Sequence, residues 1–186
     1  MQADTKTTLL DIAEQAARSR GFDGFSYADL AQAAGIRKAS IHYHFATKAV
    51  LSAALMDRYH AAVEQACVDI ETAHDRAADR LAALVTFYRD ALGGGETLCL
   101  CVAFTISRDS LADDVKGKIV DFRAMMTTWI TALLELGKRD GTISAISAPE
   151  AEAHATLATL EGAHLAAHAD YDLTAFDKAT EVLLAR

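Results

Sequence analysis

An all-α fold is predicted by three features of the 186-residue sequence. Helix-favouring Ala, Leu and Glu are frequent, and Pro149 is the only proline that could interrupt a helix. Neither an alternating apolar–polar run nor an Asn-Gly hairpin signal indicates a strand. Because 52% of the residues are hydrophobic, the chain can bury a real core. The predicted architecture is an N-terminal three-helix head at 1–47 and a C-terminal helical bundle at 48–186.

The first helix is expected over 5–20. Arg18 and Arg20 favour its C-terminal dipole, and Gly21 ends it. One apolar stripe at helical spacing marks its buried face: Leu9, Ile12, Ala13, Ala16 and Ala17.

A second helix is expected over 27–34. Ser26 is its predicted N-cap, with Asp29 completing a short-armed capping box. Phe25 and Leu30 occupy the positions of a hydrophobic staple. Gly35 follows where a left-handed residue is needed, so a tight turn leads to the next helix.

The third helix, over 38–44, is rich in hydrogen-bond donors and has no acid. Two short helices joined by a glycine turn form a helix-turn-helix, whose second helix can lie in the major groove of DNA. Thr47 is expected to cap the following helix, and Lys48 in its first turn is expected to bind a phosphate. The alternative is a helical hairpin with a solvated polar face.

Residues 4–64 resemble the DNA-binding domain of the tetracycline-repressor (TetR) family. The matching residues are Gly21-Phe22, Phe25-Ser26, Asp29-Leu30-Ala31, Ala34-Gly35-Ile36, Ser40-Ile41, Tyr43-His44-Phe45 and Lys48. The resemblance implies a dimeric, all-α transcriptional regulator, usually a repressor that a small ligand releases from DNA. It also implies that the C-terminal bundle binds that ligand and forms the dimer.

By the same resemblance, one set of residues would contact the groove or the DNA backbone. His42 departs from the aromatic pair that family members commonly carry before His-Phe, and it is a shorter, titratable group. The expected DNA-binding residues are Ser26, Tyr27, Arg37, Lys38, Ala39, Ser40, His42, Tyr43, His44, Thr47 and Lys48.

The acidic net charge of −8 is unevenly distributed. Residues 1–60 carry seven Lys or Arg and six acids, a net +1, so the remainder carries −9. Local rather than total charge governs DNA binding, so we expect modest non-specific affinity and specificity from paired half-sites of a near-palindromic operator.

The sequence disfavours several other classes of protein, among them membrane proteins, zinc-binding proteins and enzymes. No 18-residue apolar run or signal segment occurs, so we expect a cytoplasmic protein without a membrane span. Three cysteines in no zinc spacing are expected to be reduced there. No nucleophile elbow, phosphate loop or dinucleotide fingerprint occurs, and we expect neither enzymatic activity nor a cofactor.

The remaining helices are expected over 48–71, 75–92, 98–108, 113–139, 149–169 and 173–185. Gly93-Gly94-Gly95 is expected to form a loop or hinge, and Pro149 opens its helix at a favoured position. In the family the last two helices form a four-helix dimer interface; an ordinary intrachain core would use the same residues. The residues expected at this interface are Ala151, Ala155, Ala158, Leu165 and Ala166 in the first of the two helices, and Leu173, Phe176, Val182, Leu183 and Leu184 in the second.

Aromatic and Met side chains gather in the middle helices and suit a pocket for an apolar or amphipathic effector, although they equally suit plain core. Tyr88, Trp129 and His164 are the stronger candidates because each adds a polar atom. The expected pocket residues are Phe87, Tyr88, Phe104, Phe122, Met125, Met126, Trp129 and His164.

Two further hypotheses concern reactive residues. Some branches of the family carry a sensing cysteine near Cys99 and Cys101, and a thiol near a helix N-terminus reacts more easily. A disulfide between these two is geometrically poor, and cysteine is also a common buried residue.

Glu71-x-x-His74 and Glu161-x-x-His164 also match the spacing of a ferritin-like di-iron bundle, the alternative enzyme or metal-protein class. His164 and His168 lie one turn apart, but no acid or Cys at fixed spacing supports a metal site, so none is expected.

Overall fold

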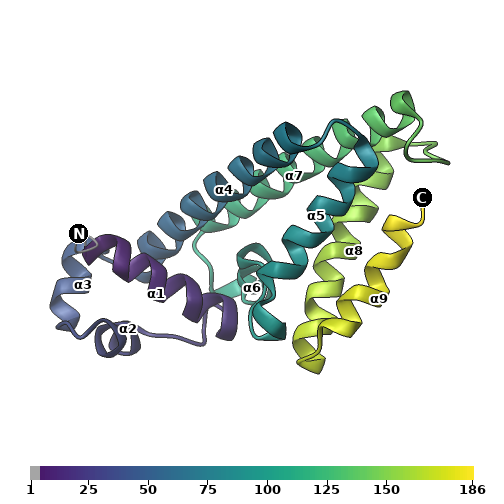
Figure 1. The fold of residues 1–186 in the computed structure, drawn as a ribbon. Helices are drawn as coiled ribbons and strands as arrows, with labels where there is room; N and C mark the ends of the chain where they lie inside the picture. The colour runs from purple at the N-terminus through teal and green to yellow at the C-terminus, as the bar shows by residue number, and fades with distance from the viewer. Residues whose placement is uncertain (1–4) are drawn as a thin grey trace. The chain divides into compact units, whose positions relative to one another are not determined.

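The computed structural model describes residues 5–186, and every regular element among them is helical (Figure 1). The helices are α1 (Thr5–Arg20), α2 (Tyr27–Ala34), α3 (Lys38–His44), α4 (Lys48–Ala73), α5 (Ala77–Ala91), α6 (Leu100–Ile106), α7 (Asp113–Asp140), α8 (Pro149–Asp170) and α9 (Leu173–Leu184). Two short 3-10 turns, Gly93–Gly95 and Arg108–Ser110, flank α6. The all-α prediction is confirmed, and α1, α2 and α3 begin and end at the residues expected from the sequence.

The chain divides into two compact units, which differ from the expected division after residue 47. The first comprises Met1–Ala61 and Leu100–Asp121, and the second Ala62–Cys99 and Phe122–Arg186. Helix α6 joins the first unit because it packs against α1. The rings of Phe22 and Phe104 meet edge to face there, 5.8 Å between centroids, a favourable aromatic geometry. Helices α4 and α7 each contribute to both units.

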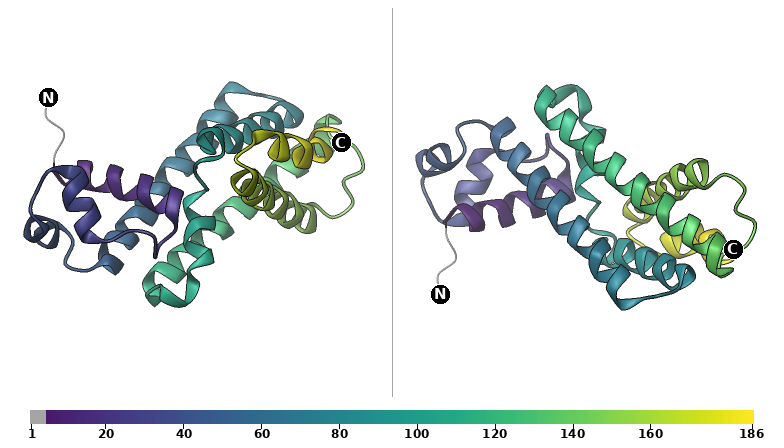
Figure 2. Two further views of the ribbon diagram at one scale, coloured as in Figure 1. Left: turned by 90° about the horizontal axis from the view of Figure 1, so that it is seen from below. Right: turned by 90° about the horizontal axis from the view of Figure 1, so that it is seen from above.

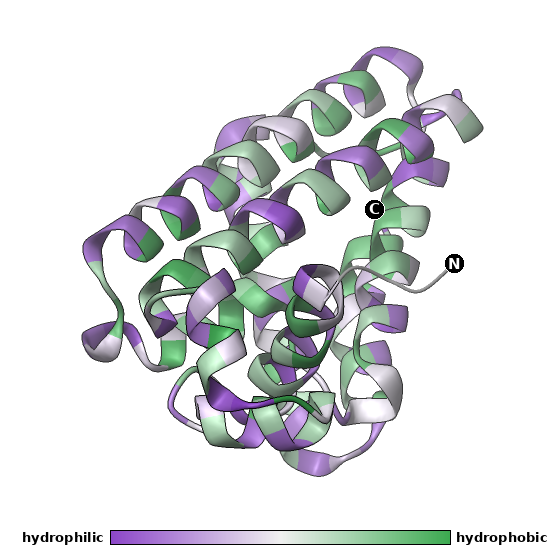
Figure 3. Cartoon of the chain, turned by 90° about the vertical axis from the view of Figure 1, so that its left-hand side faces the viewer, coloured by the Kyte–Doolittle hydropathy of each residue, from purple (hydrophilic) through white to green (hydrophobic). Residues whose placement is uncertain are grey.

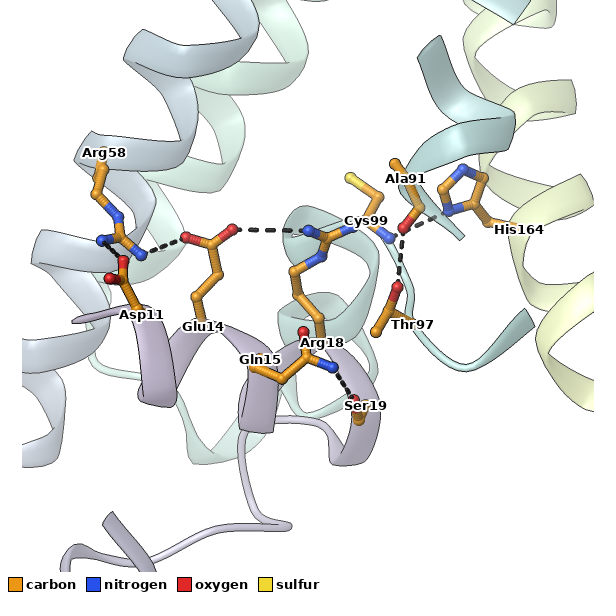
Figure 4. A network of polar contacts seen from close by, with 10 residues as sticks. All are labelled: Asp11, Glu14, Gln15, Arg18, Ser19, Arg58, Ala91, Thr97, Cys99 and His164. Atoms are coloured by element: carbon orange, nitrogen blue, oxygen red, sulfur yellow. Dashed lines mark hydrogen bonds and ion pairs between the residues drawn. The ribbon is translucent and has the colours of Figure 1, made fainter. Parts of the chain in front are cut away.

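The first unit is built around the apolar faces of α1, α2 and α3. Leu9, Leu30 and Ile41 are buried together with Phe45. Arg58 of α4 adds a polar clamp, since its guanidinium donates to the carboxylates of Asp11 and Glu14 on α1, both at 2.6 Å (Figure 4). This clamp ties α1 to the part of α4 that belongs to the same unit.

The second unit is centred on α5, α8 and α9, with α8 and α9 lying side by side in both views of Figure 2. Green and purple segments alternate along the helices in Figure 3, as expected for helices with one buried face. Phe176 of α9 and Leu157 of α8 are fully buried. The Arg89 guanidinium forms two bonds with the Asp177 carboxylate, at 2.6 and 3.0 Å, and so joins α5 to α9.

The triple glycine forms a packed turn, which differs from the hinge considered from the sequence. All three residues have positive φ, from +53° to +99°, a region that favours glycine. A Cβ on Gly95 would lie 3.1 Å from the Tyr171 carbonyl carbon and 3.2 Å from the Ala167 oxygen. The Gly95 carbonyl also accepts a bond from His168 Nδ1 at 2.8 Å. The turn is therefore fixed against the end of α8.

Candidate nucleic-acid interface

Helices α2 and α3 form the helix-turn-helix expected from the sequence. The Asp29 carboxylate accepts from the Ser26 backbone N–H at 2.7 Å, and Ser26 Oγ accepts from the Asp29 N–H at 3.4 Å, so the capping box is present. Two hydrogen bonds hold the pKa of Asp29 below its ordinary value. The bond from the Ser26 hydroxyl has the larger effect, and the bond from the Ser26 backbone N–H has the smaller. Gly35 ends α2 in the left-handed conformation, φ 66° and ψ 27°.

Helix α3 buries one residue and presents the others outward. Ile41 is fully buried, which fixes the helix on the head, whereas the Tyr43 side chain is 87% exposed. No acid lies in the first turn of α3. Exposed side chains at the turn and along this helix are Arg37, Lys38, Ala39, His42 and Tyr43, with Ser40 and His44 half-buried. These seven expected DNA contacts therefore lie on one short segment that can fit a major groove.

Two other expected contacts, Tyr27 and Thr47, have structural roles within the chain, as Ser26 does in the capping box. Tyr27 is buried and its hydroxyl donates to the Phe45 carbonyl at 3.0 Å, and burial raises its pKa to about 12. Thr47 Oγ1 caps α4 by accepting from the Val50 N–H at 3.2 Å, and its side chain remains exposed. The Tyr27 hydroxyl cannot bind a phosphate without losing its bond to the Phe45 carbonyl.

Lys48 is also occupied within the chain. Its ammonium donates to the carbonyls of Phe22 and Phe25 and lies over both rings, 4.4 and 4.2 Å from their centroids. Burial lowers the pKa of Lys48 from its ordinary value, against the opposing effect of Asp23 and Asp29. The side chain thus supports the loop before α2, a role that differs from the phosphate contact expected from the sequence.

Residues 9–55 match the sequence model for bacterial regulatory proteins of the tetR family. The fold of a TetR-family transcriptional regulator from Agrobacterium tumefaciens matches along 98% of this chain and 96% of that chain, with 28% identity and a TM-score of 0.93. The head of the chain therefore belongs to the tetR family of bacterial regulatory proteins.

Relatives with curated names match the head of the chain. The HTH-type transcriptional regulator TtgR of Pseudomonas putida is 37% identical over 57 residues, which cover 31% of this chain and 27% of the length of TtgR. The regulatory protein TetR from Rhodobacter sphaeroides matches 96% of both chains with a TM-score of 0.89 and 19% identity, a likeness of fold. No helix among residues 5–186 is long and apolar enough to cross a membrane.

The expected effector residues are divided between the two units. Phe104 lies in the first unit and the others lie in the second. Five are buried: Tyr88, Phe104, Phe122, Met126 and His164; Phe87, Met125 and Trp129 are half-buried.

A groove of about 680 Å³ lies between α4 and α5 within the second unit. Phe87 is the one expected pocket residue that lines it. Alanines, an isoleucine, three aspartates, a histidine and a threonine complete the lining. Sequence reasoning missed these other residues because exposed Ala and Asp on a helix resemble an ordinary solvated face. The lining residues are Ala66, Asp69, Ile70, His74, Asp79, Ala82, Ala83, Thr86, Phe87 and Asp90.

His164 has a structural role. Its Nδ1 accepts from the Cys99 backbone N–H at 3.1 Å, and its Nε2 donates to the Tyr88 carbonyl at 2.8 Å (Figure 4). Both ring nitrogens are therefore used, with the imidazole neutral. The residue ties α8 to α5 and to the segment before α6.

The cysteines are buried thiols. Cys99 and Cys101 are 1% and 0% exposed, and Cys67 is also buried. Burial raises the pKa of the Cys67 thiol to about 12, with Glu71 and Glu64 adding to the effect. A sensing reaction at any of the three therefore requires the chain to open.

The Glu-x-x-His pairs have other partners. Glu161 pairs with Arg123, and His164 with the two backbone groups described above. Glu71 lies 3.9 Å from the Arg80 guanidinium. Residues 5–186 contain no group of three or more His, Cys, Asp or Glu placed to hold a metal ion. The arrangement gives no support to a di-iron centre.

Proposed function

We propose that this chain is a sequence-specific, DNA-binding transcriptional repressor that acts as a homodimer on a near-palindromic operator. The observation that carries the proposal is the exposed, acid-free face of α3, held on a capped helix-turn-helix. In this geometry the recognition helix enters the major groove, and a dimer reaches two half-sites about one helical turn, roughly 35 Å, apart. A bacterial regulator of this kind works in the cytoplasm, where the chromosome lies.

The homodimer is supported by an exposed stripe along α8. Of the residues expected at the interface, Phe176 and Leu183 belong to the intrachain core. The α8 residues, in contrast, are exposed. Ala151, Ala155 and Ala158 follow one another at intervals of about one turn, and the adjacent Leu165 and Ala166 lie two turns further on. Val182 and Leu184 of α9 are exposed as well, at 61% and 51%. Small apolar residues on a helix surface permit close approach of a partner helix.

A small-molecule effector that releases the DNA is the second part of the proposal. The groove between α4 and α5 offers apolar walls with a few polar groups, the usual character of a ligand site. In addition, the Trp129 indole Nε1 is buried without an acceptor within residues 5–186. An unpaired buried N–H is unfavourable by about 1–3 kcal/mol, so an acceptor on a bound molecule would be stabilising. Release requires that the effector bind the DNA-free form more tightly.

The test of DNA binding is selection from a random duplex library with the purified chain, followed by a gel-shift titration of the enriched sequence. A palindromic sequence bound at nanomolar protein, against a scrambled competitor, is the expected result. Retention of DNA without enrichment of any sequence would contradict sequence-specific regulation.

The effector part needs a separate measurement. A small-molecule library is screened by thermal shift on wild-type protein and on Ala83→Trp, which fills the groove. A compound that stabilises only the wild type and lowers operator affinity supports release through the groove. A compound that stabilises both proteins equally binds outside the groove. Tight binding of a compound without a change in operator affinity contradicts release from DNA.

A further inference from the structure

The His42 imidazole is held in one orientation by two neighbours in the head. Its Nδ1 lies 3.1 Å from the Ala46 carbonyl oxygen. Its ring lies against the ring of Tyr27, 4.9 Å between centroids with the planes tilted by 57°. Tyr27 is itself fixed, since it is buried and bonded to the Phe45 carbonyl. Although exposed, the His42 side chain is thus restricted by both Ala46 and Tyr27.

The Ala46 contact determines which ring nitrogen carries the proton. A carbonyl oxygen only accepts, so Nδ1 must be the donor in this bond. In a neutral imidazole the other nitrogen, Nε2, then has a lone pair and only accepts. No described residue donates to Nε2, and the side chain is exposed. His42 therefore presents an acceptor to whatever α3 contacts.

This acceptor differs in kind from the two cations at the start of α3. Arg37 and Lys38 can only donate, and they match the acceptor atoms of guanine or a phosphate. In the major groove the donors are the amino groups, N4 of cytosine and N6 of adenine. Guanine O6 and thymine O4 are acceptors and would face the Nε2 lone pair unfavourably.

On the basis of the proposed DNA binding, we propose that His42 is a specificity-determining residue that accepts a hydrogen bond from a base amino group. It would select adenine or cytosine over guanine or thymine at one position of each half-site. A single neutral hydrogen bond of this kind corresponds to about a three- to tenfold preference.

The test compares selections from a random duplex library at pH 8. His42→Phe keeps a ring against Tyr27 and removes Nε2, and His42→Lys replaces the acceptor with an obligate donor. The wild type should enrich adenine or cytosine at one position per half-site. His42→Phe should lose that preference alone, and His42→Lys should shift it to guanine or thymine. Circular dichroism and retained preferences at the other positions check the fold of each variant.

A second measurement needs no protein variant. In the selected operator, the amino group at that position is deleted by placing purine for adenine or pyrimidin-2-one for cytosine. Wild-type affinity should fall about three- to tenfold, with no comparable fall from the same deletion at a neighbouring position.

Three results would overturn the inference. The first is a wild-type preference for guanine or thymine at the position that His42→Phe affects, since Nε2 would then be a donor. The second is an unchanged sequence preference in His42→Phe. The third is unchanged affinity on amino deletion. Failure of the proposed function has a different signature, because the wild type would then enrich no sequence at all.

Discussion

Lys48 and Phe25 are joined twice: the ammonium donates to the Phe25 carbonyl at 2.6 Å and lies 4.2 Å from the centre of the same residue's ring. A partly buried cation bonded to carbonyls and resting on aromatic faces is stabilising within the chain. This relationship makes Lys48 a support for the loop that leads into α2. It also bears on how much of the charge at the start of α4 remains for DNA.

Lys48→Met should destabilise the head while leaving its phosphate contacts intact. The variant keeps the apolar stem and removes the donor, and we expect a loss of about 1–2 kcal/mol, or a few degrees in Tm. The measurements are thermal unfolding and the slope of log affinity against log salt. An unchanged slope agrees with the intrachain role, whereas a slope reduced by about one would restore a phosphate contact.

Asp29→Asn should flatten the acid limb of the unfolding profile. The folded pKa of Asp29 is lowered, so its contribution is present above the unfolded pKa near 3.8 and is lost as pH falls through the lower folded value. The free energy of unfolding of the wild type should thus exceed that of the variant most above pH 4, and the difference should narrow towards pH 2.5. Urea unfolding across pH 2.5–5.5 measures it. Parallel curves for the two proteins throughout that range would contradict the role of the capping box.

His164→Leu should be strongly destabilising although the replacement is apolar. It leaves the Cys99 N–H and the Tyr88 carbonyl without the ring that pairs them, and we expect a loss of about 2–4 kcal/mol. His154→Leu is the matched control, because His154 is exposed on the same helix and its replacement should stay within about 0.5 kcal/mol. Chemical unfolding measures the stability of both variants. An equal loss of stability in His164→Leu and His154→Leu would refute the structural role of His164.

Ala155→Asp should separate the proposed dimer. A carboxylate within the α8 stripe would be buried against the partner helix, so we expect a monomer by analytical ultracentrifugation and at least about a tenfold weaker operator affinity. Ala73→Asp, exposed near the end of α4, serves as the control and should remain dimeric. A dimeric Ala155→Asp protein with normal affinity would place the interface elsewhere.

The head was predictable from sequence because its signals are local. Ser26, Asp29 and Gly35 fix the ends of α2 through bonds that span only a few residues, and the structure has each of them. The DNA-facing role of α3 was indicated by its hydrogen-bond donors and by the absence of an acid within the helix. Local chemistry of this kind does not depend on how the rest of the chain packs.

Contacts between segments far apart in the sequence were harder to predict. The partners of Lys48 lie 23 and 26 residues away, and nothing in the sequence marks two carbonyl oxygens as its acceptors. His164 likewise binds backbone groups 65 and 76 residues earlier, so its polar ring suggested a ligand contact. In α8 the same Ala-rich pattern suits core and interface, and only exposure separates the residues buried beneath α9 from those outside.

The exposed stripe of α8 has a genetic consequence if it pairs two chains. A chain with an intact stripe and a damaged α3 would still take a wild-type partner, and the mixed dimer would engage only one half-site. Lesions in the recognition helix should therefore be dominant when both copies are expressed. Lesions in the stripe itself should be recessive, because the altered chain would leave its wild-type counterparts free to pair with each other.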